Sequence, residues 1–173
     1  MCDLVDQNSI KGIVEEILLI NSSDREIEQE APRKGFSYIP SPIRLYIDSG
    51  GGDVYSYLGL IAVMRNSVTP VHTYVMGAAM SAAFMIAAMG QKRFCYKEST
   101  YMYHQTSTQS CGTLEDVKND MEHLHELEKR CNTILFKRTN LSARVVRPYH
   151  VKNKDWYMTS SEALGWGVVD HII

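Results

Sequence analysis

Residues 76–89, which read MGAAMSAAFMIAAM, constrain the fold of this chain more than any other stretch. The five residues before them, VHTYV, predict a strand, and the small residues around Ser81 permit a sharp turn from that strand into a closely packed helix. The first N–H groups of such a helix favour a developing negative charge beside the hydroxyl. The run also fits plain helix packing, and it is not the G-x-S-x-G elbow of many hydrolases.

Strands and helices are predicted to alternate on both sides of this stretch. Apolar spacing predicts helices over residues 10–20, 54–66, 113–139, 142–150 (broken near Pro148) and 160–164; β-rich composition predicts strands over 43–47, 71–75, 93–96, 101–104 and 168–172. Residues 24–41 are polar, contain two prolines and a glycine, and predict a long loop insertion. The alternation indicates one α/β domain over residues 1–173, built from βαβ-like units that bind ligands outside the carboxyl ends of their strands.

The composition excludes several classes of protein. The net charge of -2 offers no electrostatic reason to bind nucleic acid or an acidic membrane surface. Cys2, Cys95, Cys111 and Cys131 are scattered without a C-x-x-C pair, which favours reduced thiols over a disulfide framework or a zinc site. The first residues, MCDLVD, have neither the basic nor the apolar region of a signal peptide, and no apolar run is long enough to span a bilayer, so a cytoplasmic protein is expected.

Residue types that serine hydrolysis requires occur at suggestive places. Ser81 lies in the small-residue stretch, His104 ends a predicted strand, and Asp155 precedes two aromatic residues. Residues 50–52 are three glycines after a predicted strand, and backbone without Cβ atoms can approach a substrate closely. Each feature also has a plain explanation: a core or surface histidine, a solvated acid, a turn. The glycines also suit a phosphate cradle, although they lack the P-loop and G-x-G-x-x-G patterns.

Four motifs within residues 43–173 resemble, in the same order, those of ClpP-type serine peptidases, the family of ATP-dependent Clp protease proteolytic subunits. Residues 47–54 (IDSGGGDV) resemble I-N-S-P-G-G-x-V, and residues 77–81 (GAAMS) are similar to the nucleophile motif G-x-A-A-S. Residues 101–105 (YMYHQ) resemble the histidine segment V-M-I-H-Q. Residues 155–170 (DWYMTSSEALGWGVVD) resemble the tail D-x-x-(M/L)-(S/T)-A-x-E-A followed by G-(L/V)-(V/I)-D.

This resemblance implies a role for each motif residue. Ser81 is the implied nucleophile, His104 the general base and then acid, and Asp155 the carboxylate that orients the imidazole. The implied oxyanion donors are backbone N–H groups of the residues Gly51, Gly52 and Ala82, with Gly52 preferred over Gly51. No metal or cofactor is implied.

The resemblance also implies an architecture and partners. The expected fold is ClpP/crotonase-like, and the helix over 113–139 would protrude as a handle joining two rings. The implied assembly is a homo-oligomeric heptameric ring, stacked in pairs as a tetradecamer, which encloses a chamber for unfolded proteins or peptides. An AAA+ unfoldase is the implied partner. The resemblance implies no nucleic-acid partner and no membrane partner.

The chain departs from the family pattern in several places. Gly50 and Thr106 stand where prolines are usual, and Ser81 and His104 are 23 residues apart, a shorter spacing that resembles ClpP-like proteins of phages. The N-terminal axial segment that contacts an unfoldase is not recognised. Three alternatives therefore stand beside a Clp-type endopeptidase: a phage-type maturation protease acting without an unfoldase, a catalytically silent ring subunit, and a crotonase-fold acyl-CoA enzyme.

Overall fold

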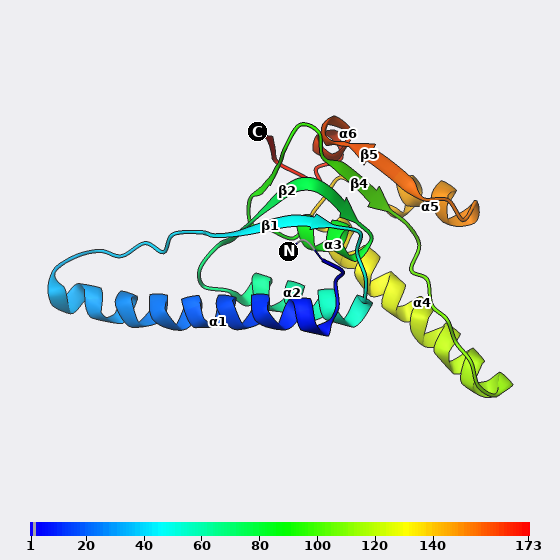
Figure 1. Cartoon of the computed structure of the whole chain (residues 1–173), viewed down its shortest axis with the longest axis horizontal. Coiled ribbons are helices and arrows are strands. Elements are labelled where there is room, and N and C mark those ends of the chain that lie inside the picture. Colours follow the sequence, from blue (N-terminus) through cyan, green and yellow to red (C-terminus); the bar gives the residue numbers. More distant parts are fainter. Residues whose placement is uncertain (2) are drawn as a thin grey trace.

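The computed structural model describes residues 1 and 3–173, so Cys2 lies outside the described residues. The helices are α1 (Gln7–Glu30), the 3-10 helix η1 (Ala31–Lys34), α2 (Val54–Asn66), α3 (Ala82–Ala87), α4 (Leu114–Phe136), α5 (Ala143–Val151) and α6 (Ser160–Gly165). The strands are β1 (Ile43–Ser49), β2 (Val71–Met80), β3 (Arg93–Cys95), β4 (Thr100–Tyr103), β5 (Trp156–Thr159) and β6 (His171–Ile172). Figure 1 shows α1 and α2 on one side of the sheet and α4 extending away from it.

The sheet is built around β2. Its first half pairs with β3 on one edge and its last residues with β4 on that same edge, while β1 pairs with it on the other edge. All three pairings are parallel, β6 adds to β3 in parallel, and β5 adds to β4 in antiparallel. The α/β fold predicted from the sequence is confirmed. The parallel arrangement brings the carboxyl ends of β1, β2 and β4 to one edge, where Ser81 and His104 follow their strands.

Helix α1 is longer than the sequence predicted. It begins at a capping box in which the Asp6 carboxylate accepts the Ser9 N–H at 2.8 Å. It then continues through turn-forming residues because these are held by distant partners: Asn21 accepts the Thr69 N–H at 3.1 Å, and buried Asp24 accepts the Thr69 hydroxyl. The predicted loop over 24–41 is therefore wrong for residues 24–34, which are helical.

Other boundaries also differ from the prediction. β2 continues to Met80, five residues past the predicted end at 75, because β1 and β4 both supply partners there. β5 was not predicted, although its alternating burial is typical of a strand. The predicted final strand over 168–172 shrinks to β6, since Val168 and Val169 pack in the core instead. Pro148 lies inside a continuous α5 rather than breaking it.

Close packing in the core explains the small residues within residues 76–89. Every residue of α3 is buried, with Phe84 and Ile86 fully enclosed, and the helix packs on β1, β2, β4 and α2. Alanine at 82, 83 and 87 allows this close approach on several sides at once. Within residues 1 and 3–173, no helix combines the length and hydrophobicity needed to cross a membrane.

Candidate active site

Ser81 sits at a strained turn between β2 and α3. Its backbone has φ 53° and ψ -118°, a conformation that L-residues other than glycine rarely adopt and that is commonest at functional sites. Two backbone hydrogen bonds hold the turn: the Ser81 N–H donates to the Met102 carbonyl at 2.9 Å, and the Ser81 carbonyl accepts the Met85 N–H at 3.2 Å. The turn places the Ser81 hydroxyl between the end of β2 and the start of α3.

The glycine run lies directly against this turn. A Cβ atom on Gly51 would come within 2.7 Å of the Ser81 Cβ and 2.6 Å of the Met80 carbonyl, so no larger residue fits there without movement. The two motifs are also joined by Asp48, whose carboxylate accepts the Ala78 N–H at 2.8 Å. A Cβ on Gly77 would lie 2.9 Å from that carboxylate, which explains the glycine at the head of the GAAMS motif.

Two backbone N–H groups beside Ser81 are available to a ligand. Those of Gly52 and Ala82 make no hydrogen bond to any residue that the structure describes. The Gly51 N–H instead donates to the Ser49 hydroxyl at 3.2 Å, so it is already occupied. Of the two glycines considered from sequence, Gly52 is therefore the one whose N–H is not bonded within the described residues, as is also true of Ala82.

The structure brings His104 and Ser81 together and leaves Asp155 slightly apart. The His104 Nε2 and the Ser81 Oγ are 2.7 Å apart, a short hydrogen bond. The His104 Nδ1 and the Asp155 Oδ1 are 3.7 Å apart, which is an ion-pair distance but longer than a hydrogen bond. The Asp155 side chain is 49% exposed, so solvent reaches the carboxylate. All three side chains thus lie at one edge of the sheet. Ser81 and His104 are hydrogen-bonded, whereas His104 and Asp155 are not.

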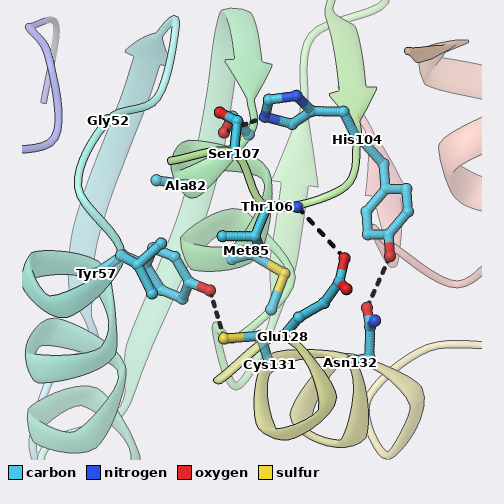
Figure 2. A pocket seen from close by; sticks show the side chains of 13 residues that line it. Gly52, Tyr57, Ala82, Met85, His104, Thr106, Ser107, Glu128, Cys131 and Asn132 are labelled. Atoms are coloured by element: carbon cyan, nitrogen blue, oxygen red, sulfur yellow. Dashed lines mark hydrogen bonds between the residues drawn. The ribbon is translucent and has the colours of Figure 1, made fainter. Parts of the chain in front are cut away.

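A pocket opens beside the Ser81–His104 pair, between α2, α3 and α4. Its walls are residues of these helices and of the segment after β4, and Figure 2 shows them as sticks. The helical lining residues to which sequence reasoning gave no role in the site are Val54, Tyr57, Met85, Glu128, Cys131 and Asn132. Only their helical periodicity was visible in the sequence, and it marks residues that face inward without distinguishing a pocket wall from the core.

Burial keeps the phenol and thiol groups of the pocket neutral. Burial raises the pKa of Tyr57 and of Tyr103 well above the ordinary tyrosine value. It also raises the pKa of the Cys131 thiol, which accepts a hydrogen bond from the Tyr57 hydroxyl at 2.7 Å. The raised pKa values disfavour the ionised forms of the two tyrosines and the cysteine, and among the described serines Ser81 is the one whose hydroxyl is hydrogen-bonded to an imidazole.

Val5, near the N-terminus, packs against the glycine run, a contact that the sequence did not reveal. The Val5 N–H donates to the Gly51 carbonyl at 2.8 Å, and the Val5 carbonyl accepts the Asp53 N–H at 2.7 Å. A Cβ on Gly52 would lie 2.2 Å from the Val5 carbonyl oxygen, so this contact also requires glycine. The donor N–H of Gly52 is consequently held in place from behind by backbone.

Comparison with known proteins gives the family. The model of the family described as "Clp protease" matches residues 37–173. The chain is 27% identical to "ATP-dependent Clp protease proteolytic subunit 2" of Treponema pallidum (strain Nichols), covering 91% of this chain and 81% of that protein. It is 32% identical to "ATP-dependent Clp protease proteolytic subunit 1" of Prochlorococcus marinus (strain MIT 9312), covering 76% and 67%. Against "ATP-dependent Clp protease proteolytic subunit 2" of Synechococcus sp. (strain CC9605) the identity is 28%, covering 99% and 80%.

Proposed function

Because this chain belongs to the Clp protease family and is a serine-type peptidase, we propose that it cleaves peptide bonds through an acyl-enzyme formed on Ser81. The observation that carries the proposal is the 2.7 Å contact between the Ser81 Oγ and the His104 Nε2 at a strained strand-to-helix turn. A serine hydroxyl is a weak nucleophile until an adjacent base takes its proton.

The proposed reaction follows from the positions of these groups. The Ser81 Oγ attacks the carbonyl carbon of the scissile bond while its proton passes to the His104 Nε2. The carbonyl oxygen then carries the negative charge, beside the unoccupied N–H groups of Gly52 and Ala82. The His104 imidazolium returns the proton to the leaving amine, and a water molecule, activated in the same way, hydrolyses the acyl-enzyme.

Asp155 is proposed to orient His104. A carboxylate near the Nδ1 fixes the tautomer that leaves the Nε2 free to accept the serine proton, and it stabilises the imidazolium. The 3.7 Å separation needs to shorten by roughly 1 Å to become a hydrogen bond. Half-exposed Asp155 has the freedom to make that movement when substrate binds or when subunits assemble.

Reaction with an active-site probe tests the function. A fluorophosphonate should modify the protein once per chain, and peptide mapping should place the adduct on Ser81, because among the described serines it is the one whose hydroxyl has an imidazole partner. The same preparation should hydrolyse quenched fluorogenic peptides, and pre-treatment with the probe should abolish this hydrolysis. An adduct on another serine, or hydrolysis that persists after complete labelling, would contradict the proposal.

We propose further that the peptidase works inside a homo-oligomeric chamber, with a heptameric ring or a stacked pair of rings as the assembly. The first half of α4 supports this, because it extends from the body in Figure 1 with Leu114 75% and Met121 44% exposed. Apolar residues on a protruding helix are stabilised when a second subunit covers them. The proposed setting is the cytoplasm.

Light scattering tests the assembly and a protein substrate tests its partner. The expected molar mass is seven or fourteen times the 19.6 kDa of one chain, and a stable monomer would contradict the chamber. Casein hydrolysis that rises when an AAA+ unfoldase and ATP are added would support the Clp-type function. Unchanged hydrolysis would favour the phage-type protease. A correctly assembled oligomer that is inert to small peptides would favour the silent ring subunit.

A further inference from the structure

One charged side chain lies in the pocket beside Ser81 and has no role in the proposed reaction. Glu128 of α4 lines the pocket, and its side chain is only 15% exposed. Figure 2 shows it pointing from α4 toward Thr106, below His104. A carboxylate is rarely buried to this degree without a charged partner, because removing it from water is costly.

The place of the pocket identifies the part of a substrate that enters it. The pocket is lined by Ser81 and His104 and by the two residues with free N–H groups, Gly52 and Ala82. The side chain on the acyl side of the scissile bond is attached to the carbon next to the reacting carbonyl. It therefore points into whatever space adjoins the nucleophile and the oxyanion donors, which here is this pocket.

Glu128 is only weakly bound to the protein around it. Its Oε1 accepts the Thr106 N–H at 3.3 Å, and its Oε2 accepts the Gln105 side-chain amide at 3.5 Å, the upper limit for a hydrogen bond. The His150 Nδ1 is 4.0 Å from its Oε1, and no lysine or arginine of the described residues is paired with Glu128. The carboxylate therefore keeps capacity to accept strong, charge-assisted hydrogen bonds.

The hydrogen bonds of the neighbouring Tyr103 and His150 do not reach the Glu128 carboxylate. The Tyr103 hydroxyl donates to the Asn132 Oδ1 at 2.7 Å, so it accepts the proton on the His150 Nε2, which is 2.9 Å away. The His150 Nδ1 lies 4.0 Å from the Glu128 Oε1, beyond hydrogen-bond distance, so it does not donate to the carboxylate. Burial raises the pKa of Tyr103, and the negative charge of the nearby Glu128 raises it further.

The remaining walls suit a long side chain with a charged end. Val54, Met85 and the ring of Tyr57 offer apolar surface between the nucleophile and α4. Methylene groups of lysine or arginine pack well on such a surface while their charged ends reach a polar partner. We propose that Glu128 makes this pocket selective for lysine or arginine on the acyl side of the cleaved bond. The inference rests on the proposed function and adds the class of substrate.

Paired peptides measure the selectivity directly. Quenched peptides that differ only at this position would carry lysine, arginine, norleucine or glutamate, norleucine being close in shape to lysine without its charge. For the wild type, kcat/KM for lysine and arginine should exceed that for norleucine by about tenfold or more, the lower range for a close charge pair. Glutamate should be the poorest. In Glu128→Gln the ratio of kcat/KM for lysine to kcat/KM for norleucine should fall to about one, because the charge pair is lost.

Glu126→Gln provides the matched control. Glu126 lies on the same helix, but its side chain is 75% exposed and pairs with Lys129 at 3.8 Å, so this change should leave the ratio intact. Sequencing the products of a random peptide library with wild type alone gives an answer that does not depend on any variant folding. Basic residues should dominate the acyl side of its cleavage sites.

The possible outcomes distinguish the proposed role of Glu128 from the proposed function. Wild type that reacts with a fluorophosphonate and cleaves peptides, but prefers norleucine to lysine, would overturn the role of Glu128 and leave the proposed function standing. A Glu128→Gln variant with the wild-type ratio would do the same. Wild type that neither reacts with the probe nor cleaves any peptide of the series would overturn the proposed function and this inference with it.

Discussion

Ser81→Ala is expected to lower kcat for peptide hydrolysis by about 10⁵–10⁶-fold, the effect that loss of a serine nucleophile has in other peptidases. Alanine keeps the Cβ atom and so fits the same backbone, and the change removes the hydroxyl and its 2.7 Å contact with His104. Stability should hardly change, because the residue lies at the surface of a pocket and its hydroxyl has no other hydrogen-bond partner among the described residues. Far-UV circular dichroism and the thermal midpoint would verify the fold.

Graded variants distinguish a catalytic group from a structural one. His104→Ala should cost about as much as Ser81→Ala, and the double variant little more, because groups that act as one unit are not additive. Asp155→Asn should cost less, about 10⁴-fold, since it affects only the orientation of the imidazole. Hydrolysis by Ser81→Ala within tenfold of wild type, from a preparation free of contaminating peptidase, would refute the acyl-enzyme.

Asp170→Asn is expected to lower the free energy of unfolding by about 2–3 kcal/mol, less than the roughly 3–5 kcal/mol lost from a fully buried ion pair, because the Asp170 side chain is 33% exposed. Its partner Arg93 is 7% exposed and donates to the Asp170 carboxylate from its Nε at 3.0 Å, from its Nη2 at 2.5 Å and from its backbone N–H at 2.8 Å. The same guanidinium donates to the carbonyls of Gly167 and Arg138, at 2.7 and 2.8 Å. The Arg93 side chain thus joins β3 to the segment that follows α4 and to the segment that follows α6.

The pH dependence of stability gives a second measurement on this pair. Burial alone would raise the pKa of Asp170, but hydrogen bonds and charge from Arg93 outweigh it, so the pKa lies below its ordinary value. A depressed carboxyl pKa contributes stability that is present above the unfolded-state value, about 3.9, and is lost as the pH falls through the lower folded value. Wild type should therefore lose stability at acidic pH more steeply than Asp170→Asn.

Urea unfolding at neutral and acidic pH would measure both effects. Glu15→Gln is the control, because Glu15 pairs with Lys11 at 3.8 Å and both side chains are largely exposed, at 60% and 74%. Exposed pairs of this kind contribute about 0–1 kcal/mol, so this variant should resemble wild type. An equal loss in the two variants, or no loss in Asp170→Asn, would mean that the ion pair does not stabilise the fold.

The sequence by itself determined most of the elements, β5 excepted, the strand end that carries Ser81, and the family. These features are local: strand and helix patterns repeat every two or about 3.6 residues, and a serine among alanines at a strand end can be recognised within a dozen positions. The histidine and aspartate were found because each lies in its own short motif. Such patterns depend on neighbours along the chain, which is all that a sequence shows directly.

Only the tertiary structure decided which groups these motifs bring together and which they leave free. Gly52 rather than Gly51 keeps an unoccupied N–H because Ser49 folds back on the latter, and α1 extends through Asn21 because Thr69 satisfies it from a distant loop. Glu128 was one acid among many on a charged helix until the fold placed it in the pocket beside Ser81. The physical reason is the same throughout: burial and long-range hydrogen bonds are set by packing between segments far apart in the chain, and no local pattern encodes them.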